Sequence, residues 1–305
     1  MATIHQINHP GQELIIRYKN CNKYKDDYKF NNNSINEGIR YWNRYDAHKR
    51  KFIESYGKYV DNFVEKSATL YFWGEYEGFS EFELLQWENK GNYWEQPCAI
   101  HKPFFFNQKI NKQNTDPFIF GDNWYYAICK KNKLKNIQNN DIILFGSEFG
   151  SKDNEKFYLD TLFVVKQSLS SIIDKTLYDD IYIESTLTRI GINSCSKGNL
   201  PIHTAQNFSN NNSIFSFFPA TIDKNSESFG KRPHFDADFM EKLGLQKPGA
   251  RTGCKSRKLT ESENIIDIWK TISNKVIEQG FVLGTYANKL NFKSIDFENK
   301  KNDNI

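Results

Sequence analysis

Two glutamates, Glu75 and Glu77, stand two residues apart in the segment FWGEYEGFSEFE, among aromatic side chains. The run that ends at Trp73 is rich in strand-forming residues. If the strand continues to Glu77, both carboxylates point to the same side of it. Apolar walls favour the neutral form of one carboxyl, which then acts as an acid while the other stays ionised. Such a pair suits hydrolysis of a glycosidic or N-glycosidic bond. The alternative is a solvated acidic turn with Trp73 packed inward.

A histidine in the segment AIHKPFFF is the second candidate for acid–base chemistry. His101 stands beside Lys102 and before Pro103, and an imidazole that titrates near neutral pH can carry a proton. The alternative is a histidine that simply ends a strand. Glu75, Glu77 and His101 are therefore the catalytic candidates, and the sequence leaves open whether the protein is an enzyme.

The segment DPFIFGDNWYYAICKK concentrates five aromatic side chains before a cysteine and two lysines. In a strand, Trp124 and Tyr126 share one face, whereas Tyr125 lies on the other. An aromatic ring that stacks on a nucleic-acid base contributes about 1–3 kcal/mol per base. The alternative is that all three rings belong to the core.

Two glycine-containing segments, FGKRPHFDADF and ARTGCKSRK, carry a dense group of basic residues. Such residues bind phosphate through charge-assisted hydrogen bonds, and the alternative is a solvated loop that balances nearby acids. Together with the aromatic segment, they give these candidate ligand-binding residues: Trp73, Asp116, Asp122, Trp124, Tyr126, Lys130, Arg232, His234 and Arg251.

Several common catalytic motifs are missing from the chain. The sequence has no H-E-x-x-H, no G-x-S-x-G, no G-x-x-x-x-G-K-[ST] and no G-x-G-x-x-G. It therefore contains no motif that would indicate one of these four common enzyme classes. The six histidines are spread singly, without the spacing of ligand pairs. We therefore predict no metal site and no cofactor.

The composition indicates a globular protein with a very polar surface. A formal net charge of +4 is smaller than that of a dedicated duplex-DNA binder, but it permits a local basic groove. Five scattered cysteines without a C-x-x-C pair favour a reducing compartment. No leader sequence and no long apolar window is present, so we expect a cytoplasmic protein without a membrane partner.

The hydrophobic pattern predicts a single α+β domain over residues 1–305. We expect a central mixed or antiparallel, partly barrel-like sheet flanked by helices. Strands are expected at Ala68–Trp73, Ile142–Phe145 and Tyr158–Val165, where short β-prone runs are bounded by polar segments.

Apolar residues spaced three and four apart predict a helical N-terminal subregion at residues 34–66. A long basic loop region is expected at 221–259, where glycines and prolines accumulate. A helix is expected at 260–279, with Thr260 and Glu263 as its capping box.

Short motifs between about residues 114 and 166 resemble the nucleotide modification associated domains, a loosely defined set of prokaryotic and phage families. Those families carry an Asn/Asp-Pro-Phe start, an Ala-x-Cys-Lys segment, a Gly-Asp-hydrophobic strand that ends in glycine, and a final strand. Asn140 stands here where those families usually have the glycine. The matching positions are Asp116, Pro117, Phe118, Ala127, Cys129, Lys130, Asp141, Gly146 and Ser147.

The resemblance implies a prokaryotic or phage-related protein that acts around modified nucleotides or DNA, in DNA modification or anti-phage defence. The leading expectation is recognition or processing of a nucleotide, modified base or nucleic acid. One alternative is a hydrolase or transferase that acts on a nucleoside-type substrate through Glu75 or Glu77 and His101. Another is a non-enzymatic subunit, with a protein partner, of a defence assembly.

Overall fold

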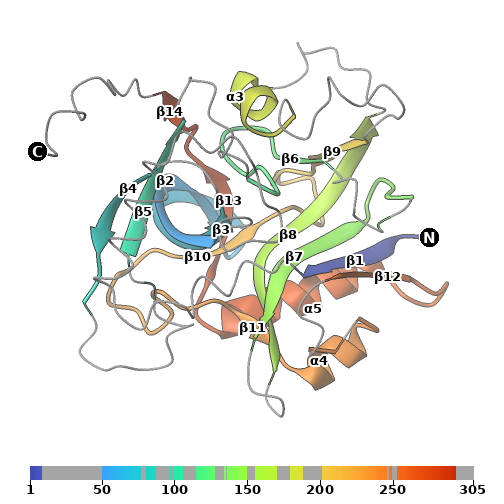
Figure 1. Ribbon diagram of the computed structural model, residues 1–305. Coiled ribbons are helices and arrows are strands. Elements are labelled where there is room, and N and C mark those ends of the chain that lie inside the picture. Colours follow the sequence, from blue (N-terminus) through green and yellow to red (C-terminus); the bar gives the residue numbers. More distant parts are fainter. Residues whose placement is uncertain are drawn as a thin grey trace, which may run out of the picture.

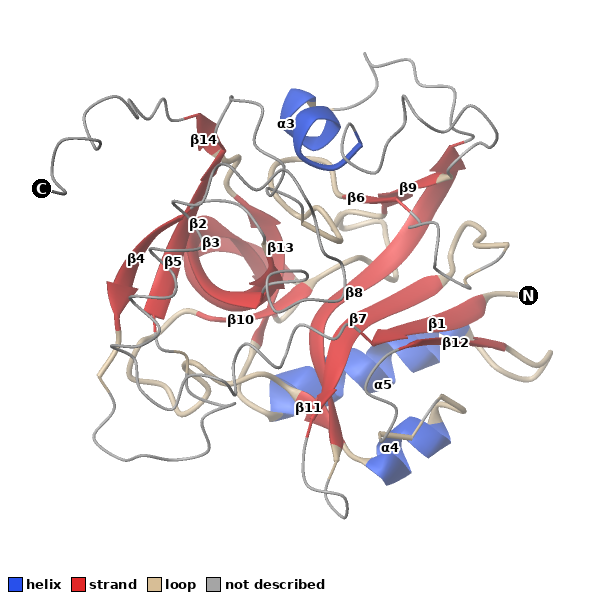
Figure 2. Cartoon of the chain, viewed as in Figure 1, coloured by secondary structure: helices blue, strands red, loops and turns tan. Residues whose placement is uncertain are grey.

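The computed structural model describes residues 1–8, 50–76, 80–86, 97, 99–105, 115–127, 134, 136–149, 155–169, 179–187, 201–245, 247–248 and 253–292. In these residues, fourteen strands form two mixed seven-stranded sheets, and only three α-helices accompany them. The fold is therefore mostly β, and the predicted helix-flanked α+β fold is wrong. Figures 1 and 2 show the two sheets next to each other.

The first sheet has the order β12-β1-β7-β8-β9-β6, with β11 paired to β8. β1 is parallel to β7 and antiparallel to β12, and the remaining pairs are antiparallel. Its strands are β1 (Thr3–Asn8), β6 (Tyr125–Ala127), β7 (Ile142–Phe149), β8 (Lys156–Leu169), β9 (Ile202–Ala205), β11 (His234–Phe235) and β12 (Gly253–Lys258).

The second sheet has the order β13-β10-β3-β2-β5-β14, with β4 paired to β5. An additional pairing between β13 and β2 closes the strands β2, β3, β10 and β13 into a ring, which is visible at the left of Figure 1. Its strands are β2 (Arg50–Asp61), β3 (Val64–Glu75), β4 (Ser80–Leu84), β5 (Ala99–Phe105), β10 (Phe218–Thr221), β13 (Val282–Ala287) and β14 (Asn291–Phe292).

The long hairpin of β2 and β3 corrects the helix predicted at residues 34–66, within the part that the structure describes. Phe52 and Ile53 are neighbours and both are buried, so β2 buries side chains on its two faces. A strand buried in this way shows no alternation, and its apolar spacing can mimic that of a helix. The turn residues Asn62 and Phe63 both have positive φ, as a two-residue hairpin turn requires, although neither is glycine.

The predicted strands are confirmed: Ala68–Trp73 lies within β3, Ile142–Phe145 within β7, and Tyr158–Val165 within β8. Each run is apolar along most of its length because the strand is buried over that stretch. Continuous apolar runs of this kind are typical of strands covered on both sides.

The helices are α3 (Asp180–Tyr182), α4 (Ala237–Lys242) and α5 (Ile265–Glu278), and α3 continues into a π-helical turn at Ile183–Leu187. The helix predicted at 260–279 is confirmed as α5. It begins later than expected because Asn264, rather than Thr260, caps it by accepting a hydrogen bond from the backbone N–H of Ile266. No helix in the described residues is long and apolar enough to cross a membrane.

The region 221–259 contains more regular secondary structure than the predicted long loop. It contains α4 as well as the strands β11 and β12, between stretches of irregular chain. Asp236 caps α4 through a hydrogen bond from the backbone N–H of Phe239.

The core has two main parts. One lies where the two sheets meet and includes side chains such as Ile143 and Phe163 from the first sheet and Leu70 and Phe72 from the second. The other lies on the opposite face of the first sheet, where α4 and α5 cover β7 and β8. Because both faces of the first sheet are packed against other elements, its strands are held in place. The polar residues near the ends of these strands are thereby positioned.

Replacing Gly57 with alanine is expected to destabilise the ring of strands by about 1–3 kcal/mol, because the added methyl group overpacks the core. A Cβ at this position would lie 2.1 Å from the carbonyl oxygen of Tyr286, across the β2–β13 pairing. Gly74 is the matched control, because a Cβ there would meet only side-chain atoms at ordinary contact distances, 3.4 Å from Ile53 and 3.6 Å from Phe72. Urea unfolding of both variants measures the difference, and equal stability of the two would contradict this packing argument.

Candidate functional site

A small pocket opens between the two sheets and joins residues that are far apart in the sequence. Its cavity volume is about 10 Å³, and about 300 Å³ of space lies between and in front of its lining atoms when open solvent is included. Its polar lining comes from three carboxyl groups and two hydroxyl groups, and its other walls are mostly apolar. The lining residues are Ile53, Gly74, Glu75, Thr115, Asp116, Pro117, Ile119, Phe120, Phe145, Asp160 and Thr161.

Glu75 reaches the pocket as the last residue of β3, where it pairs with Arg50 of β2. Its side chain is buried, with 5% of its surface exposed. Asp116 reaches the pocket from the loop before β6 and is half-buried. The hydroxyl of Thr115 donates a hydrogen bond to the carbonyl oxygen of Pro117 at 3.0 Å, which fixes this loop. The sequence selected both carboxyl groups as candidates, and the structure brings them together.

Asp160 reaches the pocket through a β-bulge in the pairing of β7 with β8. Phe145 pairs with Thr161 and Gly146 pairs with Leu159, so Asp160 is an extra residue in β8. A bulge bends a strand and redirects a side chain. It places the carboxyl group of Asp160 at the pocket instead of in the regular alternation of the strand.

Two buried arginines bind Asp160. Arg50 donates from Nε to one carboxylate oxygen at 2.5 Å and from Nη2 to the carbonyl oxygen of Gly146 at 3.4 Å. Arg232 donates from Nη2 to the other carboxylate oxygen and to the carbonyl oxygen of Tyr158. Both carboxylate oxygens of Asp160 are thus bound by guanidinium groups, and Glu75 and Asp116 are the pocket's other two carboxyl groups.

Burial disfavours the charged form of Arg232, and the carboxylate of Asp160 favours it. Burial lowers the pKa of Arg232, Asp160 opposes this by raising the pKa, and the charge of Arg50 lowers it again. The guanidinium of Arg232 also lies 5.4 Å from the centre of the Tyr158 ring, which favours its charged form. Arg232 was predicted to meet phosphate, but it is buried and engaged with Asp160.

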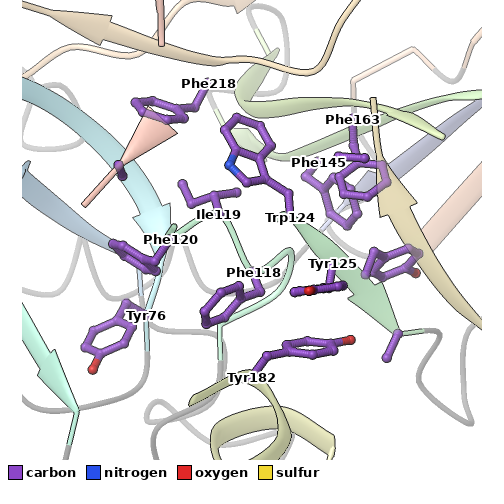
Figure 3. Close-up of a cluster of buried hydrophobic side chains, with 14 of the residues drawn as sticks. Tyr76, Phe118, Ile119, Phe120, Trp124, Tyr125, Phe145, Phe163, Tyr182 and Phe218 are labelled. Carbon is purple, nitrogen blue, oxygen red and sulfur yellow. The ribbon is translucent and has the colours of Figure 1, made fainter. Parts of the chain in front are cut away.

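The three aromatic residues of the opening segment lie in the core. Trp124 is 2% exposed and stacks on Phe218, with ring centres 5.7 Å apart. Tyr126 packs edge-on against Phe145, and Tyr125 stacks on Tyr182 at 4.5 Å (Figure 3). In this structure neither Trp124 nor Tyr126 exposes a ring face on which a base could stack.

His101 lies in a different polar cluster. Its Nδ1 is 2.9 Å from the Ser80 hydroxyl, which also accepts a hydrogen bond from the buried Lys51 ammonium at 3.2 Å. His101 is not among the residues that line the pocket. The predicted pairing of His101 with Glu75 in one catalytic site is therefore not what the structure shows.

The other candidates are dispersed. Trp73 is buried and donates from Nε1 to the carbonyl oxygen of Gly230, while Asp122 is exposed, with Lys289 Nζ 3.6 Å away. His234 Nε2 is 3.0 Å from Lys156 Nζ. Burial lowers the pKa of His234, and the charge of Lys156 lowers it further. Three predicted residues lie outside the described part of the chain: Glu77, Lys130 and Arg251.

The sequence also contained a signal for Asp160 that was not used. In the run FYLDTLFVV, Asp160 and Thr161 interrupt an otherwise apolar strand. A charged residue within a buried strand must be paired, so such a residue is a candidate on its own. No local signal connects it to Arg50, which precedes it by 110 residues.

Among the described residues, no group of three or more histidine, cysteine or acidic side chains is arranged to hold a metal ion. The carboxyl and hydroxyl groups of the pocket can transfer protons and form hydrogen bonds to a ligand.

His203 is expected to make the protein lose stability as the pH falls from about 6.5 to about 4. Burial lowers its pKa to about 4, whereas an unfolded histidine titrates near 6.5. Below pH 6.5 the unfolded chain therefore binds a proton that the folded chain does not, and about 3 kcal/mol is lost by pH 4. Urea unfolding across this range should show a smaller loss for His203→Asn, and an equal loss would contradict the assignment.

No protein-family model, no curated protein and no solved structure matches the chain. The fold and the pocket describe a mostly β protein in which an acidic pocket lies between two mixed sheets.

Proposed function

We propose that the protein binds a nucleoside-type group in the pocket between Glu75 and Asp116 and cleaves or transfers it at the glycosidic bond. The observation that carries this proposal is the convergence of these two carboxyl groups, 41 positions apart in the sequence, in one pocket with apolar walls. Two carboxyl groups across a glycosidic bond supply the acid and the base or nucleophile for such a reaction.

The lining suits a ring that carries hydroxyl or amine groups. Carboxylate oxygens accept hydrogen bonds from such groups, and the hydroxyls of Thr115 and Thr161 both donate and accept. Ile119, Phe120 and Phe145 are at most 3% exposed, so they form the apolar base of the pocket and do not stack on the ring. The cavity itself has a volume of about 10 Å³, which is room for about one water molecule. The ring of the ligand therefore lies at the open mouth of the pocket, and only one of its hydroxyl or amine groups enters.

Glu75 and Asp116 have different surroundings, which assigns them different roles. Glu75 is the more buried of the two, and burial in general disfavours a charged carboxylate, so we assign it the proton for the leaving group. Asp116 is half-buried, and its carboxylate accepts hydrogen bonds from the ligand and stabilises positive charge that develops on the sugar. The two arginines hold the side chain of Asp160 in place in the wall.

The resemblance to the nucleotide modification associated domains supports the choice of a nucleoside. Asp116 and Pro117, which open the matching segment, line the pocket. Asn140, which replaces the usual glycine, has a φ of 69°, a left-handed conformation that glycine adopts most easily and asparagine tolerates better than most residues. We place the protein, as part of the same proposal, in nucleotide or DNA modification or phage defence in the bacterial cytoplasm.

A thermal-shift screen with nucleosides, nucleotides, modified bases and simple sugars tests the proposal, because a ligand that binds the folded state raises Tm by mass action. We expect a nucleoside-type compound to stabilise the protein and to be cleaved. Glu75→Gln should then lower turnover by about 10²–10⁴-fold with affinity nearly unchanged. A non-enzymatic subunit of a larger assembly would show no stabilising ligand, and that result would contradict the proposal.

A further inference from the structure

Three residues of the first sheet form a hydrogen-bonded chain that is separate from the acidic pocket. The hydroxyl of Ser256, on β12, lies 2.7 Å from Nδ1 of His5, on β1. Nε2 of His5 lies 3.2 Å from a carboxylate oxygen of Asp141, immediately before β7. A nucleophile, a base and an oriented acid in this order define the geometry of a nucleophilic hydroxyl site.

The carboxylate of Asp141 is held in place by the backbone. It accepts hydrogen bonds from the backbone N–H of Thr3 at 2.7 Å on one oxygen and of Gln138 at 2.7 Å on the other. Asp141 and His5 are both almost completely buried. The carboxylate fixes the imidazole as the tautomer with the proton on Nε2, which leaves the lone pair of Nδ1 directed at the Ser256 hydroxyl.

The strand register presents Ser256 to solvent. The backbone N–H of Leu259 donates to the carbonyl oxygen of Ala2, which makes that pair hydrogen-bonded. Because hydrogen-bonded and non-hydrogen-bonded pairs alternate, the pair of His5 and Ser256 is non-hydrogen-bonded and its side chains are close. The backbone N–H of Ser256 therefore points away from β1. In the described residues β12 pairs only with β1, and the Ser256 side chain is exposed.

Ser168 and His203 form a second pair of a hydroxyl and an imidazole, which can be compared with Ser256 and His5. The hydroxyl of Ser168 lies 2.8 Å from Nδ1 of His203. Within the described residues, however, Nε2 of His203 is buried without a hydrogen-bond partner. Among the described residues no carboxylate orients His203, so of these two sets it is Ser256, His5 and Asp141 that has all three members.

We propose that Ser256, His5 and Asp141 form an acyl-transfer site that hydrolyses carboxylic esters. The Ser256 oxygen bonds to the ester carbonyl carbon while His5 takes the hydroxyl proton, and the C–O bond to the alcohol breaks as that proton passes to the leaving oxygen. Water, deprotonated by His5, then cleaves the acyl-serine to give the acid and to restore Ser256. The Ser256 backbone N–H lies at the open edge of β12, where it can donate to the carbonyl oxygen as negative charge develops.

The surroundings of Ser256 favour an anionic acyl group. Alternation along β12 places Lys258 on the same face as Ser256, and its side chain is exposed. Arg257, on the other face, is engaged by the carboxylate of Glu263 at 2.7 Å and 2.8 Å. Lys258 is thus placed to attract a negative charge on the acid portion of the ester.

Labelling of the full chain with a fluorophosphonate, followed by intact-mass measurement and peptide mapping, tests the proposal. The expected result is one adduct per chain, on Ser256, which is absent in Ser256→Ala and unchanged in the matched control Ser168→Ala. Asp141→Asn should slow labelling by about 10²–10⁴-fold, with circular dichroism confirming that it is folded. If Asp141→Asn does not fold, hydrolysis of p-nitrophenyl hemisuccinate by Ser256→Ala and by the unaltered protein supplies the test.

The proposal is overturned if Ser256 is not labelled, if another residue carries the adduct, or if a folded Asp141→Asn variant is labelled at the rate of the unaltered protein. Equal hydrolysis of the ester by Ser256→Ala and by the unaltered protein overturns it as well. Faster hydrolysis of p-nitrophenyl hemisuccinate than of p-nitrophenyl acetate, with the difference lost in Lys258→Ala, supports the assigned acyl group.

Discussion

Replacing Asp160 with alanine is expected to lower the free energy of unfolding by about 3–5 kcal/mol. Asp160 accepts hydrogen bonds from Arg50 and Arg232, and the three side chains are between 1% and 4% exposed. The substitution leaves two positive charges in the interior without this carboxylate, and removal of one member of a buried ionic network typically costs this much. Urea unfolding monitored by circular dichroism measures the loss.

The matched control is Asp61→Ala, which breaks an exposed ion pair. The carboxylate of Asp61 lies 2.6 Å from Lys66 Nζ, and both side chains are more than 40% exposed. Because solvent screens such a pair, we expect hardly any change in stability. Similar losses for Asp160→Ala and Asp61→Ala would show that the buried network does not stabilise the fold.

Replacing Trp124 with alanine is expected to cost about 3–5 kcal/mol, because it removes a large side chain from the centre of the core. Trp124 stacks on Phe218 and is 2% exposed, and Figure 3 shows its ring among the buried aromatic side chains. Guanidinium unfolding should give this loss, whereas Trp124→Phe should lose much less because it retains an apolar ring.

Phe63→Ala provides the comparison for an exposed aromatic residue. Phe63 is 79% exposed at the turn between β2 and β3, so its removal should change stability by only about 0.5 kcal/mol. If Trp124→Ala were as stable as Phe63→Ala, the ring of Trp124 would be available to a ligand, as the sequence had suggested.

The strands and the last helix could be predicted because their signals are local. β7 and β8 contain continuous apolar runs, and α5 has a helical apolar period and ends before Gly280, which has a positive φ of 83°. β2 was mistaken for a helix because it is buried on both faces and because its turn at Asn62 and Phe63 lacks glycine. The fold class was therefore wrong although several of its elements were right.

The candidate site was predictable in part. Glu75 and Asp116 were chosen for their residue types and their neighbours, and they share the pocket. His101 was expected beside Glu75 but contacts Ser80 instead. Sequence spacing could not show that Asp160 lines the pocket and is bound by two distant arginines, because these contacts depend on the pairing of strands far apart in the chain.

The role of the aromatic residues Trp124, Tyr125 and Tyr126 could also not be predicted from the sequence alone. Alternation correctly separates Tyr125 from Trp124 and Tyr126, but it does not tell whether a face meets a ligand or another sheet. Here both faces are covered: Tyr182 packs on Tyr125, and Phe218 packs on Trp124. The ligand that we propose therefore meets carboxyl groups rather than these rings.

The central claim, that the pocket holds a nucleoside-type ligand, is tested most directly by calorimetric titration of the best nucleoside from the screen into Asp116→Asn and Asp122→Asn. Both substitutions change a carboxylate of one loop to an amide, but only Asp116 lines the pocket, while Asp122 is exposed. The account predicts an affinity at least about tenfold weaker for Asp116→Asn, equivalent to about 1.4 kcal/mol, and an unchanged affinity for Asp122→Asn. Equal affinity of both variants and the unaltered protein would contradict it.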